Sequence, residues 1–109
     1  MAFTGNFMCT SFKVEILKGV HDFTASSGDT FKLALYTNSA SFTAGTTAYT
    51  TGNEVANSGS YSAGGGTLVS ATPVASGTTA LCDFADLAFT SATITARGAL
   101  IYNSSAAGN

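Results

Sequence analysis

Hydrophobic and polar residues alternate with a period of two over much of the chain, which predicts strands. The clearest alternation lies in residues 30–36, where Phe31, Leu33 and Leu35 share one face of the expected strand. Residues 67–74 and 78–84 flank an Ala-Ser-Gly turn, which predicts a hairpin. Residues 38–60 are rich in Thr, Ser, Gly and Ala, so we expect a long loop, called the excursion below. Tyr49 and Val55 are expected to anchor it to the core.

Residues 91–103 form a different kind of strand pattern, because both faces are mostly apolar. Such a strand is typical of the middle of a packed sheet. Its centre holds Arg97, the only arginine, and a buried guanidinium needs an acidic partner. We therefore predict a buried structural ion pair between Arg97 and Asp83 or Asp86. A ligand-binding arginine is the alternative.

Helical spacing occurs only near the N-terminus, where Phe12, Ile16 and Val20 recur at i, i+4 and i+8. Ser11 or Thr10 is the expected N-cap and Gly19 the expected C′ residue. The pattern predicts one helix of two turns whose apolar stripe covers a sheet, with partner binding as the alternative role.

The ten residues before this helix show no period and read as an arm anchored by Phe3 and Phe7. The predicted organisation is thus an N-terminal arm at 1–10 and a single β-rich domain at 11–109. The fold class is mainly β: an antiparallel β-sandwich or partly open barrel with one short N-terminal helix.

The composition is poor in charge. The 109 residues include four Lys or Arg and six Asp or Glu, with net charge −2, and polarity comes from 17 Thr and 13 Ser. Nucleic-acid binding lacks electrostatic support, so no nucleic-acid partner is expected. No apolar run is long enough for a membrane span, and the N-terminus lacks the pattern of a signal peptide. We expect the chain to work in the cytoplasm of the cell that makes it, or in a particle assembled there.

Residues with catalytic or metal-binding chemistry are sparse. His21, the only histidine, follows the expected helix and suits a contact at its C-terminal end. Cys9 and Cys82 favour two free thiols, with a single bridge as the alternative, and Cys82 has the spacing of a small buried residue. Asp22 with Asp29, or Asp83 with Asp86, gives only a weak calcium signal. We predict no catalytic residues, no metal and no cofactor.

Five runs carry a family resemblance: SFKVEILKGVHDF (11–23), DTFKLALYT (29–37), TAYTTGNEV (47–55), YSAGGGTL (61–68) and ATITARGALIYN (92–103). In nearly collinear order over the whole chain, they resemble a family of small structural proteins of tailed bacteriophages, and the last run is the most specific. The resemblance implies a virion component. Members usually continue into a further β-rich stretch, whereas this chain stops in SSAAGN, so the resemblance implies a sheet short of a strand.

The function expected from these features is that of a non-enzymatic virion structural protein that decorates or cements the capsid. Its expected partners are the major capsid protein or other virion proteins, and further copies of itself, with a trimer favoured. The alternative is a tail, fibre or receptor-binding component, in which Tyr49, Tyr61 and Tyr102 form a platform for sugar stacking.

Partner contacts are expected at two places. In the arm, Phe3 and Phe7 are the anchors. In the last strand, nothing after Asn103 favours β structure, so its free edge should receive a strand from a neighbouring subunit or shell protein, in register with Leu100 and Tyr102.

Overall fold

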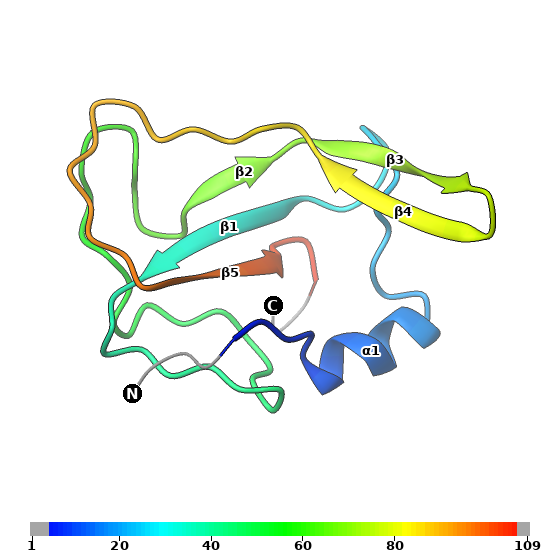
Figure 1. Ribbon diagram of the computed structural model, residues 1–109, viewed down its shortest axis with the longest axis horizontal. Helices are drawn as coiled ribbons and strands as arrows, with labels where there is room; N and C mark the ends of the chain where they lie inside the picture. The colour runs from blue at the N-terminus through cyan, green and yellow to red at the C-terminus, as the bar shows by residue number, and fades with distance from the viewer. Residues whose placement is uncertain (1–4, 107–109) are drawn as a thin grey trace.

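The computed structural model describes residues 5–106, which form one helix and five strands (Figure 1). The elements are α1 (Thr10–Leu17), β1 (Phe31–Tyr36), β2 (Gly66–Leu68), β3 (Ser70–Ser76), β4 (Thr79–Phe84) and β5 (Gly98–Asn103). All strand pairs are antiparallel. The prediction of a mainly-β chain with one short N-terminal helix is confirmed. The choice between a sandwich and a partly open barrel stays a prediction.

The central strand of the larger sheet is β1, in the order β2-β1-β5. It is buried on both faces, since Phe31 lies on one face and Tyr36 on the other with 2% and 0% exposure. We expected the central strand at 91–103, and this was wrong, because β5 covers only the end of that run and lies at the sheet edge. Before it, the Thr93 N–H donates to the Ser58 hydroxyl at 2.9 Å, so this backbone bonds to a loop instead of a strand.

Helix α1 begins after Cys9, the N-cap residue, which makes no side-chain capping bond, so the predicted N-cap was wrong. The predicted C′ residue is confirmed. Gly19 has φ of +72°, its N–H donates to the Ile16 carbonyl at 3.1 Å, and the Val20 N–H donates to the Glu15 carbonyl at 3.0 Å. This pattern is a Schellman motif, which satisfies two carbonyls of the last turn.

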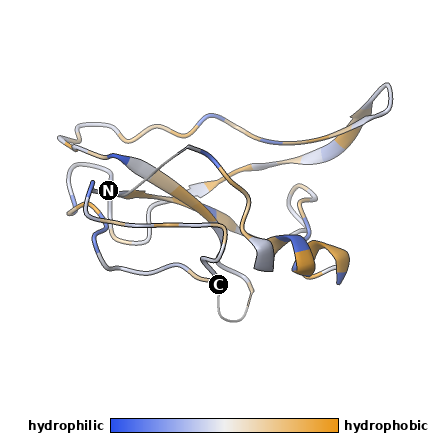
Figure 2. Cartoon of the chain, turned by 60° about the horizontal axis from the view of Figure 1, so that its bottom comes forward, coloured by the Kyte–Doolittle hydropathy of each residue, from blue (hydrophilic) through white to orange (hydrophobic). Residues whose placement is uncertain are grey.

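The predicted apolar stripe of α1 does not cover a sheet. Phe12 is half-buried, with its ring centroid 4.9 Å from that of His21, but no residue of the helix is fully buried. Four apolar side chains on or just after the helix are exposed instead: Val14, Ile16, Leu17 and Val20. Figure 2 shows hydrophobic and hydrophilic residues mixed along the helix. Of the apolar side chains in the predicted stripe, only Phe12 near the helix start is therefore half-buried.

The predicted hairpin is confirmed as β3 and β4, which form a separate two-stranded sheet joined by Gly77 and Thr78. Pro73 falls where the pairing register shifts, as its missing N–H requires. Nearly every hairpin residue is exposed, including Cys82, which we expected to be buried. The hairpin projects from the sheet at the same end of the molecule as α1 (Figures 1 and 2).

Two aromatic groups form the core around β1. On one face, Phe23 stacks on Phe31 at 4.3 Å, and Phe84 joins the hairpin to this pair. On the other, Leu100 and Tyr102 of β5 pack with Phe42 and Tyr49 against a buried cluster of Ala34, Tyr36 and Ala40. The long excursion is confirmed, and its two expected anchors hold it. Val55 is buried, and the Tyr49 ring stacks on Tyr102 at 4.6 Å.

Candidate functional site: the free edge of β5

Among residues 5–106, the outer edge of β5 presents backbone groups without a hydrogen-bond partner. The Ser104 N–H donates to the Thr30 carbonyl at 2.9 Å, in line with the β1–β5 register. Because hydrogen-bonded pairs alternate in antiparallel sheets, Leu100 and Tyr102 bond to β1, whereas Ala99 and Ile101 direct their N–H and C=O groups outward. No described residue hydrogen-bonds these four groups. The edge is therefore a template for one more strand.

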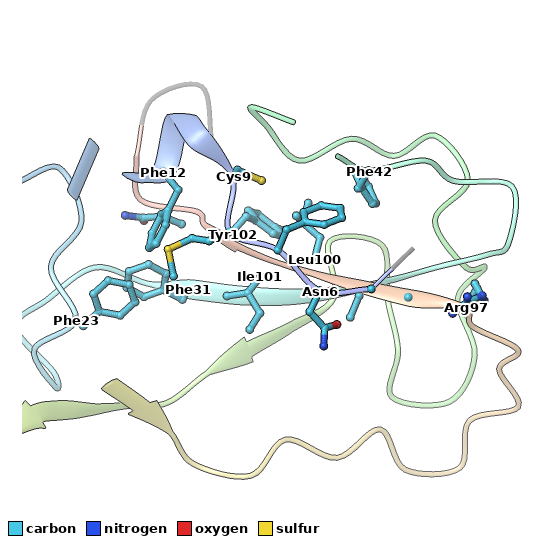
Figure 3. A pocket seen from close by; sticks show the side chains of 16 residues that line it. Asn6, Cys9, Phe12, Phe23, Phe31, Phe42, Arg97, Leu100, Ile101 and Tyr102 are labelled. Carbon is cyan, nitrogen blue, oxygen red and sulfur yellow. The ribbon is translucent and has the colours of Figure 1, made fainter. Parts of the chain in front are cut away.

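A groove of about 510 Å³ lies along this edge. Residues 97–103 form one wall and residues 5–9 of the arm form part of the other (Figure 3). The lining is mostly apolar and includes Phe7, Met8, Phe12, Phe23, Phe31, Phe42, Leu100 and Ile101. Ile101 is 52% exposed. The groove thus combines backbone donors and acceptors with apolar surface, which is what an extended peptide with apolar side chains requires.

The arm of residues 5–9 lies beside β5 of its own chain. Its C-terminal end is held by the Thr10 N–H, which donates to the Ala44 carbonyl at 2.8 Å. Of the two expected anchors, Phe7 lines the groove and is 43% exposed, and Phe3 lies outside the described residues. Contact of the arm with a neighbour stays a prediction.

Two other expected contact residues have intramolecular roles. Leu100 and Tyr102 are half-buried on the core side of β5, and the Tyr102 hydroxyl donates to the Gly64 carbonyl at 2.7 Å. The most exposed large apolar side chain of β5 is Ile101. By the period of two, it lies on the face opposite to Leu100 and Tyr102.

Arg97 is exposed, so the prediction of a buried ion pair was wrong. It lies just before β5, where its backbone N–H donates to the Tyr36 carbonyl at 2.8 Å. Asp83 lies in the projecting hairpin and Asp86 just after it, away from Arg97 (Figure 1). Within residues 5–106, neither carboxylate forms a salt bridge with Arg97. At the end of an edge strand, the guanidinium keeps its contact with water.

A carboxylate among tyrosines ties the excursion to the sheet. Glu54 accepts hydrogen bonds from the hydroxyls of Tyr49 and Tyr61, the latter at 2.6 Å, and from the Gly64 N–H at 2.8 Å. Together with Tyr102 on the Gly64 carbonyl, these residues form what we call the tyrosine network. The sequence pattern missed it because Glu54 lies in a polar segment with no strand period.

Burial and the Glu54 charge stabilise the neutral phenols. Burial, followed by the Glu54 charge, raises the pKa of Tyr36 to about 12. Burial and hydrogen bonds to Glu54 raise the pKa of Tyr49 and Tyr61 further. Tyr61 is 0% exposed. Tyr61 therefore cannot stack on a sugar in this fold, whereas Tyr49 and Tyr102 are half-buried, so the sugar platform of three tyrosines stays a prediction without Tyr61.

A second polar network joins α1 to the end of β5. The buried Asn103 amide accepts from the Ser105 N–H at 2.9 Å and donates to Asp29 Oδ2 at 2.8 Å. Its nitrogen also lies 2.9 Å from His21 Nδ1, which must therefore accept. The proton of His21 is then on Nε2, which donates to Glu15 at 2.9 Å. His21 thus contacts the last turn of the helix through a side chain, a structural role.

The cysteines and the carboxylates considered as metal ligands have structural roles or lie apart. Cys9 and Cys82 are free thiols, as favoured from the sequence. Asp22 and Asp29 accept backbone hydrogen bonds that shape the turn before β1. In the described part of the chain, no three His, Cys, Asp or Glu residues are grouped to hold a metal ion. Over the same residues, no helix has the length and hydropathy to cross a membrane.

Comparison of the chain with protein-family models, with curated proteins and with solved structures finds no match.

Proposed function

We propose that the protein is a non-enzymatic structural component of a bacteriophage virion, which decorates or cements the capsid by accepting a strand from a neighbouring shell protein along β5. The observation that carries this proposal is the free edge of β5, where Ala99 and Ile101 direct backbone groups into an apolar groove. An added strand would bond to these groups and fill the groove with alternate side chains.

Two further features support a structural role. The family resemblance of residues 92–103 points to virion proteins, and β5 lies within that run. The polar clusters of the chain, around Glu54 and Asn103, are engaged in hydrogen bonds that hold loops and the helix in place. The receptor-binding alternative loses part of its support, because Tyr61, one of its three tyrosines, is buried.

The edge can be blocked without disturbing the sheet. Ala99→Pro removes an N–H that points away from β1 and leaves the β1–β5 bonds intact. We expect this variant to fold and to enter particles on the order of tenfold less than the parent, a loss equivalent to about 1.4 kcal/mol. Ala99→Ser is the matched control, since it keeps the N–H. Normal incorporation of the folded proline variant would contradict strand addition.

The location is tested by copy number. Densitometry of stained gels of purified particles should give hundreds of copies per particle if the protein covers the capsid. A count in the tens would instead assign it to the tail or a fibre, and absence from particles would refute the virion role.

A further inference from the structure

The end of the molecule that carries α1 and the hairpin exposes two apolar patches. On α1, Val14 and Leu17 are 45% and 89% exposed. On the hairpin, Val74 and Leu81 are 61% and 46% exposed and lie directly opposite each other across the two strands. An isolated two-stranded hairpin is at best marginally stable in water, so this one gains from being covered.

The α1 patch is flanked by positive charge. Leu17 lies three residues after Val14 and four after Lys13, and Lys18, the C-cap residue, lies four after Val14, so the four residues share one helix face. All four are exposed. In the described chain, neither lysine forms a salt bridge. The one acidic residue of the helix, Glu15, lies toward His21 instead. This face therefore presents two apolar side chains between two cations.

The hairpin patch is flanked by negative charge. Leu81 and Asp83 lie on the same face of β4, because alternate residues of a strand share a face, and Val74 lies opposite Leu81. Asp86 follows, also exposed. The Asp83 carboxylate accepts the Phe84 N–H at 2.8 Å and stays exposed. The other four acidic residues accept hydrogen bonds that hold turns or side chains in place. The hairpin thus presents two apolar side chains on the face that carries Asp83, and Asp86 adds a second exposed anion just after β4.

We infer that these two patches are the halves of a reciprocal contact between two copies of this chain. Each α1 face would lie on the hairpin face of the other copy, with Lys13 and Lys18 facing Asp83 and Asp86. Charge complementarity selects this pairing, because two helix faces or two hairpin faces would bring like charges together.

The position of the patches determines the symmetry. Since α1 and the hairpin project from the same end of the molecule (Figures 1 and 2), one twofold axis lets both contacts form at once. Stable interfaces bury roughly 1,200–2,000 Å² in total. A two-turn helix cannot cover such an area alone, so the doubled contact is required. The assembly that we infer is thus a dimer, whereas the sequence analysis favoured a trimer.

This inference does not depend on the virion role or on β5, and it is tested on the full-length protein in solution. At about 100 µM, where a contact of micromolar affinity is saturated, sedimentation equilibrium should give twice the chain mass of 10.9 kDa. One double variant, Lys13→Glu with Lys18→Glu, makes both patches acidic. The other, Asp83→Lys with Asp86→Lys, makes both basic. Each alone should sediment as a monomer.

An equimolar mixture of the two variants should restore the dimer, because each acidic patch then meets a basic one in both contacts. Far-UV spectra check folding, which should be unchanged since all four positions are exposed. The inference is overturned if the parent protein is monomeric at this concentration, if either variant alone remains dimeric, or if the mixture does not associate.

Discussion

The tyrosine network and the end of the molecule that carries α1 and the hairpin differ in which groups they bury. The network buries polar groups that are hydrogen-bonded, and the other region leaves apolar side chains exposed. In the network, a carboxylate is surrounded by three donors from Tyr49, Tyr61 and Gly64, and Tyr61 is fully buried. At the other end, Leu17 and Val74 are largely exposed. Polar groups satisfied within the chain stabilise its own fold, whereas apolar groups left exposed favour association. The tyrosine network is therefore a self-sufficient region, stable within one chain, whereas the α1–hairpin end gains stability from a partner.

The largest expected effect comes from the tight turn within the self-sufficient region. Gly65 has φ of +83°, and a Cβ there would overlap the Leu33 carbonyl. Gly65→Ala should cost about 3 kcal/mol of unfolding free energy or more, from strain and overlap combined. Gly77→Ala at the hairpin tip is the matched control. Its φ is +62° but its Cβ meets open space, so it should cost only about 1–2 kcal/mol. If urea denaturation shows equal losses of unfolding free energy for the two variants, the overlap with the Leu33 carbonyl has no effect on stability.

The next effect concerns the carboxylate at the centre of the network. Glu54→Ala leaves two hydroxyls and one N–H without their acceptor, and should cost on the order of 3 kcal/mol. Glu54→Gln should cost less, since its one oxygen can still accept from Tyr61 and Gly64. Asp86→Asn, at an exposed carboxylate, should change stability by less than about 0.5 kcal/mol. Denaturation curves in which alanine and glutamine variants are equally unstable would show that hydrogen bonding to Glu54 is unimportant.

Alkaline pH should weaken the same region. The tyrosines have a higher pKa when folded than the usual value of about 10, so the folded state binds more protons above that pH. Their contribution to stability is complete below about pH 10 and is lost as pH rises through the folded pKa, about 12 for Tyr36. Denaturation at a series of pH values, with tyrosinate absorbance followed in parallel, measures this. Normal titration of all four tyrosines near pH 10 without loss of stability would contradict it.

The smallest effect on stability is expected at the end of the molecule that carries α1 and the hairpin. Leu17→Ser should change the unfolding free energy of the monomer by less than about 0.5 kcal/mol, because the side chain is 89% exposed. Leu68→Ser, at a position only 8% exposed, should cost at least about 2 kcal/mol. The two variants are compared at a dilution that keeps the protein monomeric. Similar losses would mean that Leu17 is covered within its own chain.

The sequence predicted those elements whose signals are local. The hairpin follows from its turn and flanking alternation, and the end of α1 follows from Gly19, whose positive φ a glycine adopts at little cost. The excursion was also predicted, because it lacks any period. These features depend on residues close together in the chain.

Features that depend on distant residues were missed. Apolar character on both faces suggested that residues 91–103 lie centrally, but Thr93 bonds to Ser58 and only the last six residues pair with β1. The partner of Arg97 was inferred from that wrong position. In the candidate site, addition of a partner strand to this run was predicted, in register with Leu100 and Tyr102. The residues whose backbone groups point outward, Ala99 and Ile101, follow only from the hydrogen-bonding pattern with β1.

Amide exchange at two protein concentrations tests the contrast between the two regions most directly. The Leu35 N–H, which donates to Tyr61, and the Val55 N–H, which donates to the Leu35 carbonyl, should exchange slowly in both dilute and concentrated samples. Amides that pair β3 with β4 should exchange rapidly in the dilute monomer and become protected in the concentrated sample. Equal protection of both regions in the dilute protein would show that the hairpin is stable alone and would contradict the account.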